Sequence, residues 1–234
     1  MRLPIGTFIN MATVTVGSII GLLLQSVFPE NVQQIIFQAI GLSVVLIGLQ
    51  MSFKIPDGYL LVLIFSMIIG GVIGELIGLQ SLLNQFGDWV KASLQVGDEK
   101  FTEGLVTAFL LFCIGSMAFI GALEEGLQGK RKLLNIKSTL DGISSIAFAS
   151  TYGIGVWFSI FPMLLFQGSI TVLAGAVQKF VTPIIISMIN AVGGLLILGI
   201  GINLLGLGRV NVENLLPALF VVVVITIGYE RVRK

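Results

Sequence analysis

The sequence predicts an all-α, polytopic membrane protein of about eight transmembrane helices, in which an inverted three-helix repeat flanks a central helix pair. Two bulk properties and one pattern carry this prediction. Hydrophobic residues make up 56% of the 234 residues and charged residues 11%, with a mean hydropathy of +1.04, so there is too little polar surface to cover a soluble globule. Apolar stretches of the ~20 residues that cross a bilayer recur along the chain. The pattern is a similarity between its first and last thirds.

Breaks at prolines, charges and polar clusters divide the apolar sequence into candidate helices. We place these helices at residues 5–25, 33–52, 58–79, 104–123, 139–157, 162–178, 183–206 and 213–230. The whole chain, residues 1–234, is expected to form a single transmembrane domain. Its parts are repeat one (about 5–79), an interfacial helix (about 81–96), the central helix pair (about 104–157) and repeat two (about 160–230).

Residues 81–96 differ from these spans in their periodicity. Their apolar residues recur at steps of three and four: Leu82, Leu83, Phe86, Trp89, Val90 and Leu94. This spacing predicts an amphipathic helix that lies at the membrane interface, with Trp89 at headgroup level. A solvated loop helix is the alternative interpretation of the same periodicity.

The positions of Lys and Arg predict the orientation, because cytoplasmic loops carry an excess of both. With the amino terminus inside, ten of the 13 basic residues fall inside: Arg2, Lys54, Lys130, Arg131, Lys132, Lys137, Lys179, Arg231, Arg233 and Lys234. Only Lys91, Lys100 and Arg209 fall outside. We therefore expect a multi-pass protein with both termini in the cytoplasm.

The repeat is visible as short segments that recur in the same order. Gly17-Ser18-Ile19 recurs as Gly168-Ser169-Ile170, and Ile47-Gly48-Leu49-Gln50 recurs as Ile200-Gly201-Ile202-Asn203, with offsets that stay between 151 and 155. Each helix of repeat one thus matches a helix five places later in the chain. Because five is odd, the matched helix crosses the membrane in the opposite direction. Inverted repeats are the architecture of many secondary transporters, although channels and scaffolds also arise from such duplications.

The composition excludes several classes of function. A formal net charge of +1, with scattered basic residues, gives no stripe for nucleic acid. The chain has no histidine and a single cysteine, Cys113, so histidine-dependent triads, His-ligated zinc sites and internal disulfides are excluded. No nucleophile–base pair is visible, and we expect neither an enzyme nor a cofactor nor a metal site.

Polar side chains within the spans are the candidate site residues, because hydrocarbon provides them with no partner. Carboxamides occupy matching places in the two repeats, and the central helix pair is dense in Gly, Ser and Ala, which is typical of helices that pack tightly or break. We assign the following residues to substrate binding: Asn10, Gln50, Ser116, Ser145, Ser150, Gln167, Asn190 and Asn203. A hydrogen bond between helices is the alternative role for each of them.

Two carboxylates are candidates for coupling or gating. Glu75 lies near the end of its span beside Gly70, Gly74 and Gly78, which form a smooth helix face that permits close approach of a neighbour or of a second copy in a homodimer. Glu75 either takes up protons or marks the end of the helix. Asp141 follows Lys137 by four residues, so the two can pair on one helix face, as a local stabiliser or as a gate.

Several stretches together resemble a known family. They are Gly115-Ser116-Met117, Gly121-Ala122, Gly126-Leu127, Lys137-Ser138, Asp141-Gly142, Gln167-Gly168, Gly193-Gly194 and Asn214-Leu215-Leu216-Pro217. This ordered set, over nearly the whole chain, resembles the bacterial membrane family called domain of unknown function 554. The resemblance implies a protein of the bacterial inner (plasma) membrane, and it supplies no substrate or catalytic residue.

The function expected from these observations is secondary transport of a small solute or ion by alternating access between the inverted repeats. A passive channel is the alternative, and an intramembrane enzyme or membrane scaffold is a third class. The expected partners are the lipid bilayer and a small solute or ion.

Overall fold

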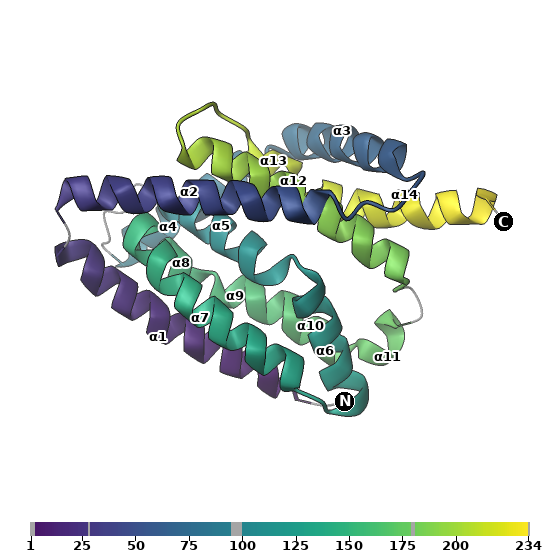
Figure 1. The fold of residues 1–234 in the computed structure, drawn as a ribbon, viewed down its shortest axis with the longest axis horizontal. Coiled ribbons are helices and arrows are strands. Elements are labelled where there is room, and N and C mark those ends of the chain that lie inside the picture. The colour runs from purple at the N-terminus through teal and green to yellow at the C-terminus, as the bar shows by residue number, and fades with distance from the viewer. Residues whose placement is uncertain (1–2, 28, 95–99, 179–180, 234) are drawn as a thin grey trace. The chain divides into compact units, whose positions relative to one another are not determined.

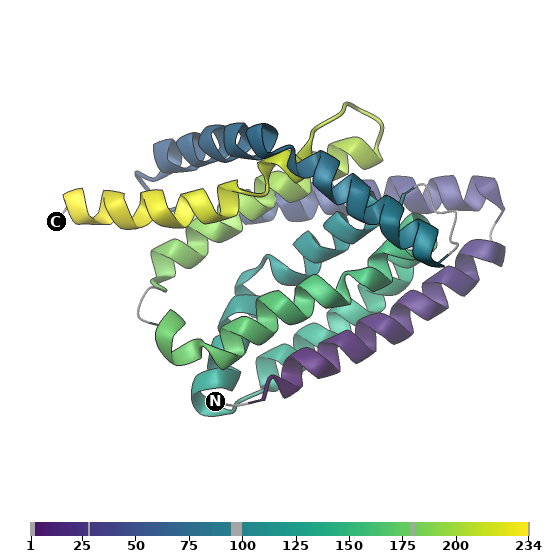
Figure 2. The same cartoon turned by 180° about the vertical axis from the view of Figure 1, so that it is seen from behind.

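The computed structural model describes residues 3–27, 29–94, 100–178 and 181–233, and its regular elements within these ranges are all helices (Figures 1 and 2). The prediction of an all-α chain is therefore confirmed. Three of the basic residues used to orient the chain, Arg2, Lys179 and Lys234, lie outside the described ranges. Contacts divide the chain into a first unit, Met1–Phe37 with Gly97–Val181, and a second unit, Gln38–Val96 with Thr182–Lys234.

Each unit combines segments that are distant in sequence. The first unit contains α1 (Ile5–Val27), α5 (Phe101–Cys113), α6 (Ser116–Gln128), α7 (Lys132–Tyr152), α8 (Gly155–Phe158), α9 (Ile160–Met163), the π-helix η1 (Leu164–Gly168), α10 (Ser169–Val172) and α11 (Ala174–Val177). The second unit contains α3 (Leu60–Ile77), α4 (Leu79–Leu94), α12 (Pro183–Leu204), α13 (Val212–Leu215) and α14 (Ala218–Arg233). The boundary between the units falls within α2 (Glu30–Ser52).

Helices α1 and α7 pack against each other along their length in the first unit (Figure 1). A Cβ atom added at Gly17 would lie 2.1 Å from the carbonyl oxygen of Gly142, and one added at Gly21 would lie 2.3 Å from that of Ile146. The partner numbers rise together, so the two helices run parallel. Glycine is required at both positions of α1 because the backbone of α7 occupies the space that a side chain would fill.

The fourth predicted helix, residues 104–123, is interrupted. Helix α5 ends at Cys113, residues Ile114 and Gly115 are extended, and α6 continues at an angle of 59° to α5. The carbonyl groups of the last turn of α5 therefore lack partners within a continuous helix. Such a break is tolerated at membrane depth only where protein or a polar cavity satisfies the freed groups.

The fifth and sixth predicted helices have different boundaries in the structure. Residues 139–157 were predicted, whereas α7 runs from Lys132 to Tyr152 and ends where Gly153 takes a φ of 72°, a left-handed conformation that favours glycine. The next span consists of short segments from Gly155 to Val172 rather than one regular helix. Pro162 and the π-helix η1 lie within it, and both interrupt the regular i to i−4 hydrogen-bond pattern.

The second unit is built on two antiparallel helix pairs. Gly48 of α2 lies against Gly194 of α12, and Gly201 of α12 lies against Gly41 of α2. In the other pair, Gly70 and Gly74 of α3 contact Ala218 and Asn214, and the rings of Tyr59 and Tyr229 lie 5.2 Å apart at the far end. In each pair the partner numbers fall as those of the first helix rise, so the helices run in opposite directions. The glycine face of α3 is thus used within the chain.

Helix α4, Leu79–Leu94, corresponds to the amphipathic helix expected at 81–96; residues 95–96 lie outside the described ranges. Leu82, Phe86 and Trp89 are exposed, and the rings of Phe86 and Trp89 stack with centroids 6.1 Å apart. The helix prediction is confirmed. Its position at the membrane interface stays a prediction.

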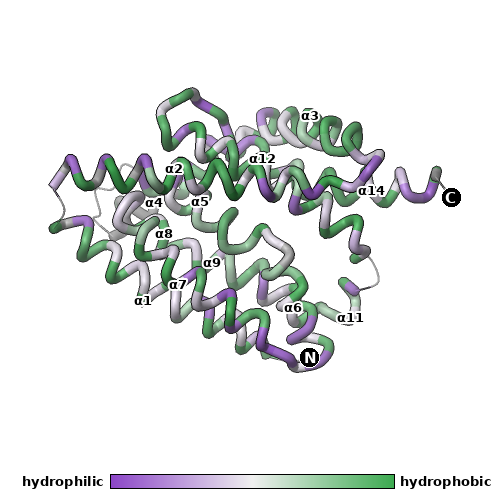
Figure 3. The backbone as a smooth tube through the Cα atoms, viewed as in Figure 1, coloured by the Kyte–Doolittle hydropathy of each residue, from purple (hydrophilic) through white to green (hydrophobic). Residues whose placement is uncertain are grey.

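Six helices of the described residues are long and apolar enough to cross a membrane, or seven if the bent α5–α6 pair forms one span. Figure 3 shows the hydrophobic colouring along much of α2, α3, α12 and α14. Large apolar side chains such as Leu61, Phe65 and Leu76 point outward from α3, which suits a lipid environment. The helix α7 is 21 residues long but is not among these spans, because Lys132, Lys137 and Asp141 reduce its apolarity. The count of eight stays a prediction.

Candidate functional site

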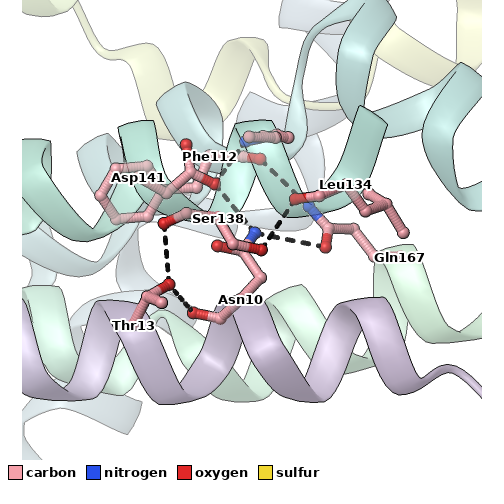
Figure 4. A network of polar contacts seen from close by, with 8 residues as sticks. Asn10, Thr13, Phe112, Leu134, Ser138, Asp141 and Gln167 are labelled. Atoms are coloured by element: carbon pink, nitrogen blue, oxygen red, sulfur yellow. Dashed lines mark hydrogen bonds and ion pairs between the residues drawn. The ribbon is translucent and has the colours of Figure 1, made fainter. Parts of the chain in front are cut away.

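A buried polar cluster occupies the interior of the first unit (Figure 4). The amide nitrogen Nδ2 of Asn10 donates to Oδ2 of Asp141 at 2.9 Å and to Oε1 of Gln167 at 3.4 Å. Lys137 donates to the same Asp141 oxygen in a close ion pair. The cluster therefore joins α1, α7 and η1, and it contains three of the predicted site residues: Asn10, Asp141 and Gln167.

The cluster reaches the break between α5 and α6 through Gln167. Its Nε2 donates to the backbone carbonyl of Phe112 at 3.3 Å, one of the carbonyls that the end of α5 leaves without a helical partner. Gln167 lies in the π-helix η1, which is flanked by α-helical segments. Single π-helical turns occur frequently at functional sites. The broken helix is thus satisfied by a side chain from a distant segment.

The cluster is almost completely buried. Asn10 and Gln167 are 0% exposed, and Lys137 and Asp141 are each 6% exposed. Removing one partner of a buried ion pair costs about 3–5 kcal/mol, because an unpaired charge stays buried, so the two opposite charges depend on each other. The oxygen Oδ1 of Asn10 is also buried and has no hydrogen-bond partner, which leaves one acceptor open in the centre of the cluster.

Backbone contacts between α1 and α7 hold the cluster in register. Thr13 Oγ1 donates to the carbonyls of Asn10 and Ser138 at 2.9 and 2.8 Å. Ser145, a predicted site residue, donates to the carbonyls of Gly142 at 2.8 Å and Val14 at 3.3 Å. These bonds make Ser145 part of the helix–helix interface, as the alternative interpretation of the sequence had it.

Glu125 forms a second buried polar contact near the start of α1. Its Oε1 accepts a hydrogen bond from the backbone N–H of Gly6 at 2.8 Å. This N–H lies in the first turn of α1 and therefore has no partner within the helix. The Nε atom of Arg131 lies 3.7 Å from the same oxygen. Glu125 is 2% exposed. The sequence did not single out this residue, because a glutamate at the end of a predicted span is typical of an interfacial position.

The predicted site residues of the second unit have local roles. Asn203 donates to the carbonyl of Val210 and accepts from its N–H, both at 2.8 Å, so it closes the loop between α12 and α13. Asn214 donates to Glu75 at 2.6 Å and accepts from the N–H of Gln80 at 2.8 Å, so Glu75 helps to hold the turn between α3 and α4. Sequence reasoning did not assign a role to Asn214.

Four predicted site residues remain: Gln50, Asn190, Ser150 and Ser116. Gln50 is exposed on α2, and Asn190 is buried within α12. Ser150 donates to the carbonyl of Ala147 in its own helix at 2.9 Å. Ser116 is the first residue of α6, and its side chain lies outside the described part of the structure.

The oxygen atoms of the cluster are of the kinds that bind one positive charge. The cluster contains one carboxylate, carboxamide oxygens and a backbone carbonyl, which are ligands for protons and hard cations. Among the described residues, no three His, Cys, Asp or Glu side chains converge as they do in transition-metal sites.

Comparison with known proteins gives matches over nearly the whole chain. A family model described as protein of unknown function (DUF554) matches residues 5–227. The chain is 35% identical over 218 residues to "Uncharacterized membrane protein YdfK" of Bacillus subtilis (strain 168), which covers 92% of this chain and 93% of that protein. It is 30% identical over 220 residues to "Uncharacterized protein YqgA" of Escherichia coli (strain K12), with the same coverage of 92% and 93%. No solved structure matches the chain.

Proposed function

The chain belongs to the DUF554 family, and its relative from Bacillus subtilis carries the name of a membrane protein; we propose that the chain is a secondary transporter of a small solute or ion. The observation that carries the proposal is the buried Lys137–Asp141 pair, linked through Asn10 and Gln167 to the break in the α5–α6 helix pair. Buried ionisable residues in membrane spans mark ion or substrate pathways, and discontinuous helices form the binding sites of many transporters.

A packing role alone accounts less well for this cluster. A dry interface of small residues needs no charges, and a buried ion pair is often no more stabilising than apolar residues of similar volume. The α1–α7 interface already has close glycine contacts beside the cluster. The cluster therefore adds polarity where packing does not require it, and polarity is what a site for a solute or ion needs.

Contacts within the second unit support an inverted repeat. An offset of 153 relates Gly41 to Gly194 and Gly48 to Gly201, so the contact between Gly48 and Gly194 has its equivalent in the contact between Gly201 and Gly41. Reciprocal contacts of this kind are expected across a two-fold axis. Because α2 and α12 are antiparallel, the axis would lie perpendicular to them, in the plane of the membrane.

The α3–α14 pair follows the same rule. With the offset of 155 that relates Lys54 to Arg209, Tyr59 corresponds to Asn214 and Gly74 to Tyr229. The contact of Gly74 with Asn214 is then equivalent to the contact of Tyr59 with Tyr229. This symmetry supports the proposal, because many secondary transporters achieve alternating access by exchanging the conformations of two inverted repeats.

We also propose that the protein resides in the bacterial inner (plasma) membrane with both termini in the cytoplasm. This orientation makes α1 and α7 cross the membrane in the same direction. It makes α2 run opposite to α12, and α3 opposite to α14. The packing directions found within each unit agree with this alternation.

The test is transport by the purified full-length protein in proteoliposomes, screened with labelled metabolites and with ions, with and without a pH gradient. We expect a saturable flux that shows counterflow and that is lost in Asn10→Leu. The control Gln85→Leu changes an exposed carboxamide of α4 and should keep the flux.

Two results decide against the proposal. Flux that lacks counterflow and does not saturate would identify a passive channel. A flux that survives in a folded Asn10→Leu variant would remove the buried cluster from the transport path.

A further inference from the structure

We propose, on the basis of the transport function above, that Asp141 is the site that binds the coupling ion, that this ion is a single proton, and that the carboxamide of Asn10 turns over when the proton binds. The inference rests on the pattern of donors and acceptors within the cluster. It assigns the coupling ion and connects its arrival to the break between α5 and α6.

The Asn10 carboxamide is satisfied on one side only. Its Nδ2 donates to Asp141 and to Gln167, so both amide hydrogens are used. Its Oδ1 is buried without a partner, and an unsatisfied buried acceptor costs about 1–3 kcal/mol. An ionised Asp141 cannot supply the missing donor, because a carboxylate only accepts hydrogen bonds.

A proton on Asp141 supplies that donor. Transfer from a hydronium ion forms an O–H bond on the carboxylate, removes its negative charge, and releases a water molecule. The protonated group donates one hydrogen bond, and a half-turn of the Asn10 amide presents Oδ1 to it. The nitrogen and oxygen of a carboxamide have nearly the same shape, so the half-turn needs no extra space.

The half-turn also moves Nδ2 of Asn10 away from both Asp141 and Gln167, to the place that Oδ1 occupied. Gln167 then loses the bond at its Oε1, while its Nε2 still holds the Phe112 carbonyl at the end of α5. Protonation at the same time weakens the attraction between Asp141 and Lys137. The state of one carboxyl group is thereby passed to the broken helix, which is the element expected to move during transport.

Few other groups near Asp141 can titrate. Helix α1, η1 and α10 contain no ionisable side chain in their sequences. Lys137 of α7 pairs with Asp141, and the thiol of Cys113 on α5 interacts electrostatically with both residues. On α6, Glu125 is engaged by the Gly6 N–H and lies near Arg131. Asp141 is the carboxylate of the cluster itself.

The test is infrared difference spectroscopy of the full-length protein in lipid vesicles between neutral and acidic pH. We expect acidification to add carbonyl absorption from protonated carboxylic acids, of which one component is lost in Asp141→Asn and retained in the control Asp57→Asn, which changes an exposed carboxylate. In protein labelled with ¹³C-asparagine, a carboxamide absorption should change with the same midpoint, and this change should be missing in Asn10→Ala.

The proposal is overturned if Asp141→Asn keeps the full acid-induced absorption, or if the labelled carboxamide does not change with pH. If Asp141→Asn does not fold, the coincidence of the two midpoints in the unsubstituted protein and its loss in Asn10→Ala decide the question. A midpoint that shifts when sodium chloride replaces choline chloride would assign an alkali ion instead of a proton. The titration needs no transport, so a titrating Asp141 in a protein without flux would refute transport and leave the proton site.

Discussion

At the scale of single residues, the Lys137–Asp141 pair explains why polar atoms gather in the first unit. The spacing of four residues on a helix allowed the pair to be predicted from the sequence, and the structure confirms it. The partners of the pair could not be predicted, since they come from α1 and η1, more than 20 residues away in sequence. Asn10 and Gln167 were recognisable only as polar residues in apolar surroundings.

A double substitution tests whether the two charges are held only by each other. Lys137→Met leaves Asp141 buried and unpaired, and we expect it to lower the free energy of unfolding by about 3–5 kcal/mol. Adding Asp141→Leu should recover most of that loss, because apolar residues of similar volume often replace a buried pair without cost. Denaturation of the three proteins in mixed detergent micelles gives the values; a double variant less stable than Lys137→Met would contradict the account.

At the scale of helices, glycine positions decide which faces can approach each other. The glycines of α3 were identified from the sequence as a smooth face, but their partners were not, because several helices offer small residues. The break between α5 and α6 was left open by the sequence: the small residues of the central pair are typical of helices that pack tightly or break, and the apolar run around Gly115 and Ser116 gives no boundary signal. The amphipathic helix α4 was found because its periodicity differs from that of every span.

Gly17→Ala tests the contact between α1 and α7. Its Cβ would lie 2.1 Å from the Gly142 carbonyl oxygen and 2.1 Å from the Ser145 hydroxyl, so the helices must separate, at a cost of about 1–3 kcal/mol. The matched control is Gly228→Ala in α14, where no atom lies within 4 Å of the added Cβ. We expect a lower melting temperature only in Gly17→Ala, and equal melting temperatures would refute the close contact.

Asn203→Ala tests the role of the predicted site residue in the second unit. The substitution removes both bonds to Val210 and should free the loop that carries the exposed Arg209, at a cost of about 1–3 kcal/mol. Trypsin should therefore cut after Arg209 faster than in the unsubstituted protein. The exposed Gln50→Ala provides the control, and an unchanged cutting rate in Asn203→Ala would show that the loop does not depend on these bonds.

At the scale of the whole molecule, composition and hydropathy were sufficient to predict a helical membrane protein. They were not sufficient to predict the grouping of helices, because α1 packs with α7 and α2 with α12 across long stretches of sequence. Composition could not decide whether α7 is an additional, eighth span, since this helix carries the charges of the buried cluster. A homodimer stays a prediction.

Cysteine labelling tests the orientation of the chain. On a Cys113→Ser background, a cysteine at position 130 should react with an impermeant thiol reagent only from the cytoplasmic side, because Lys130 belongs to the basic group expected inside. A cysteine at position 209 should react only from the opposite side. Both wild-type residues are exposed, so the reagent can reach them; labelling of both positions from the same side would refute the topology.

The measurement that tests alternating access most directly uses the single native cysteine. Cys113 ends α5 at the helix break and is 1% exposed, close enough to Lys137 and Asp141 to interact with them electrostatically. In proteoliposomes of defined orientation, an impermeant thiol reagent should reach Cys113 from either face, and a pH gradient should raise the rate from one face while lowering it from the other. Labelling from neither face, or from one face only under all conditions, would contradict alternating access at this cluster, and equal rates that ignore the gradient would identify a channel.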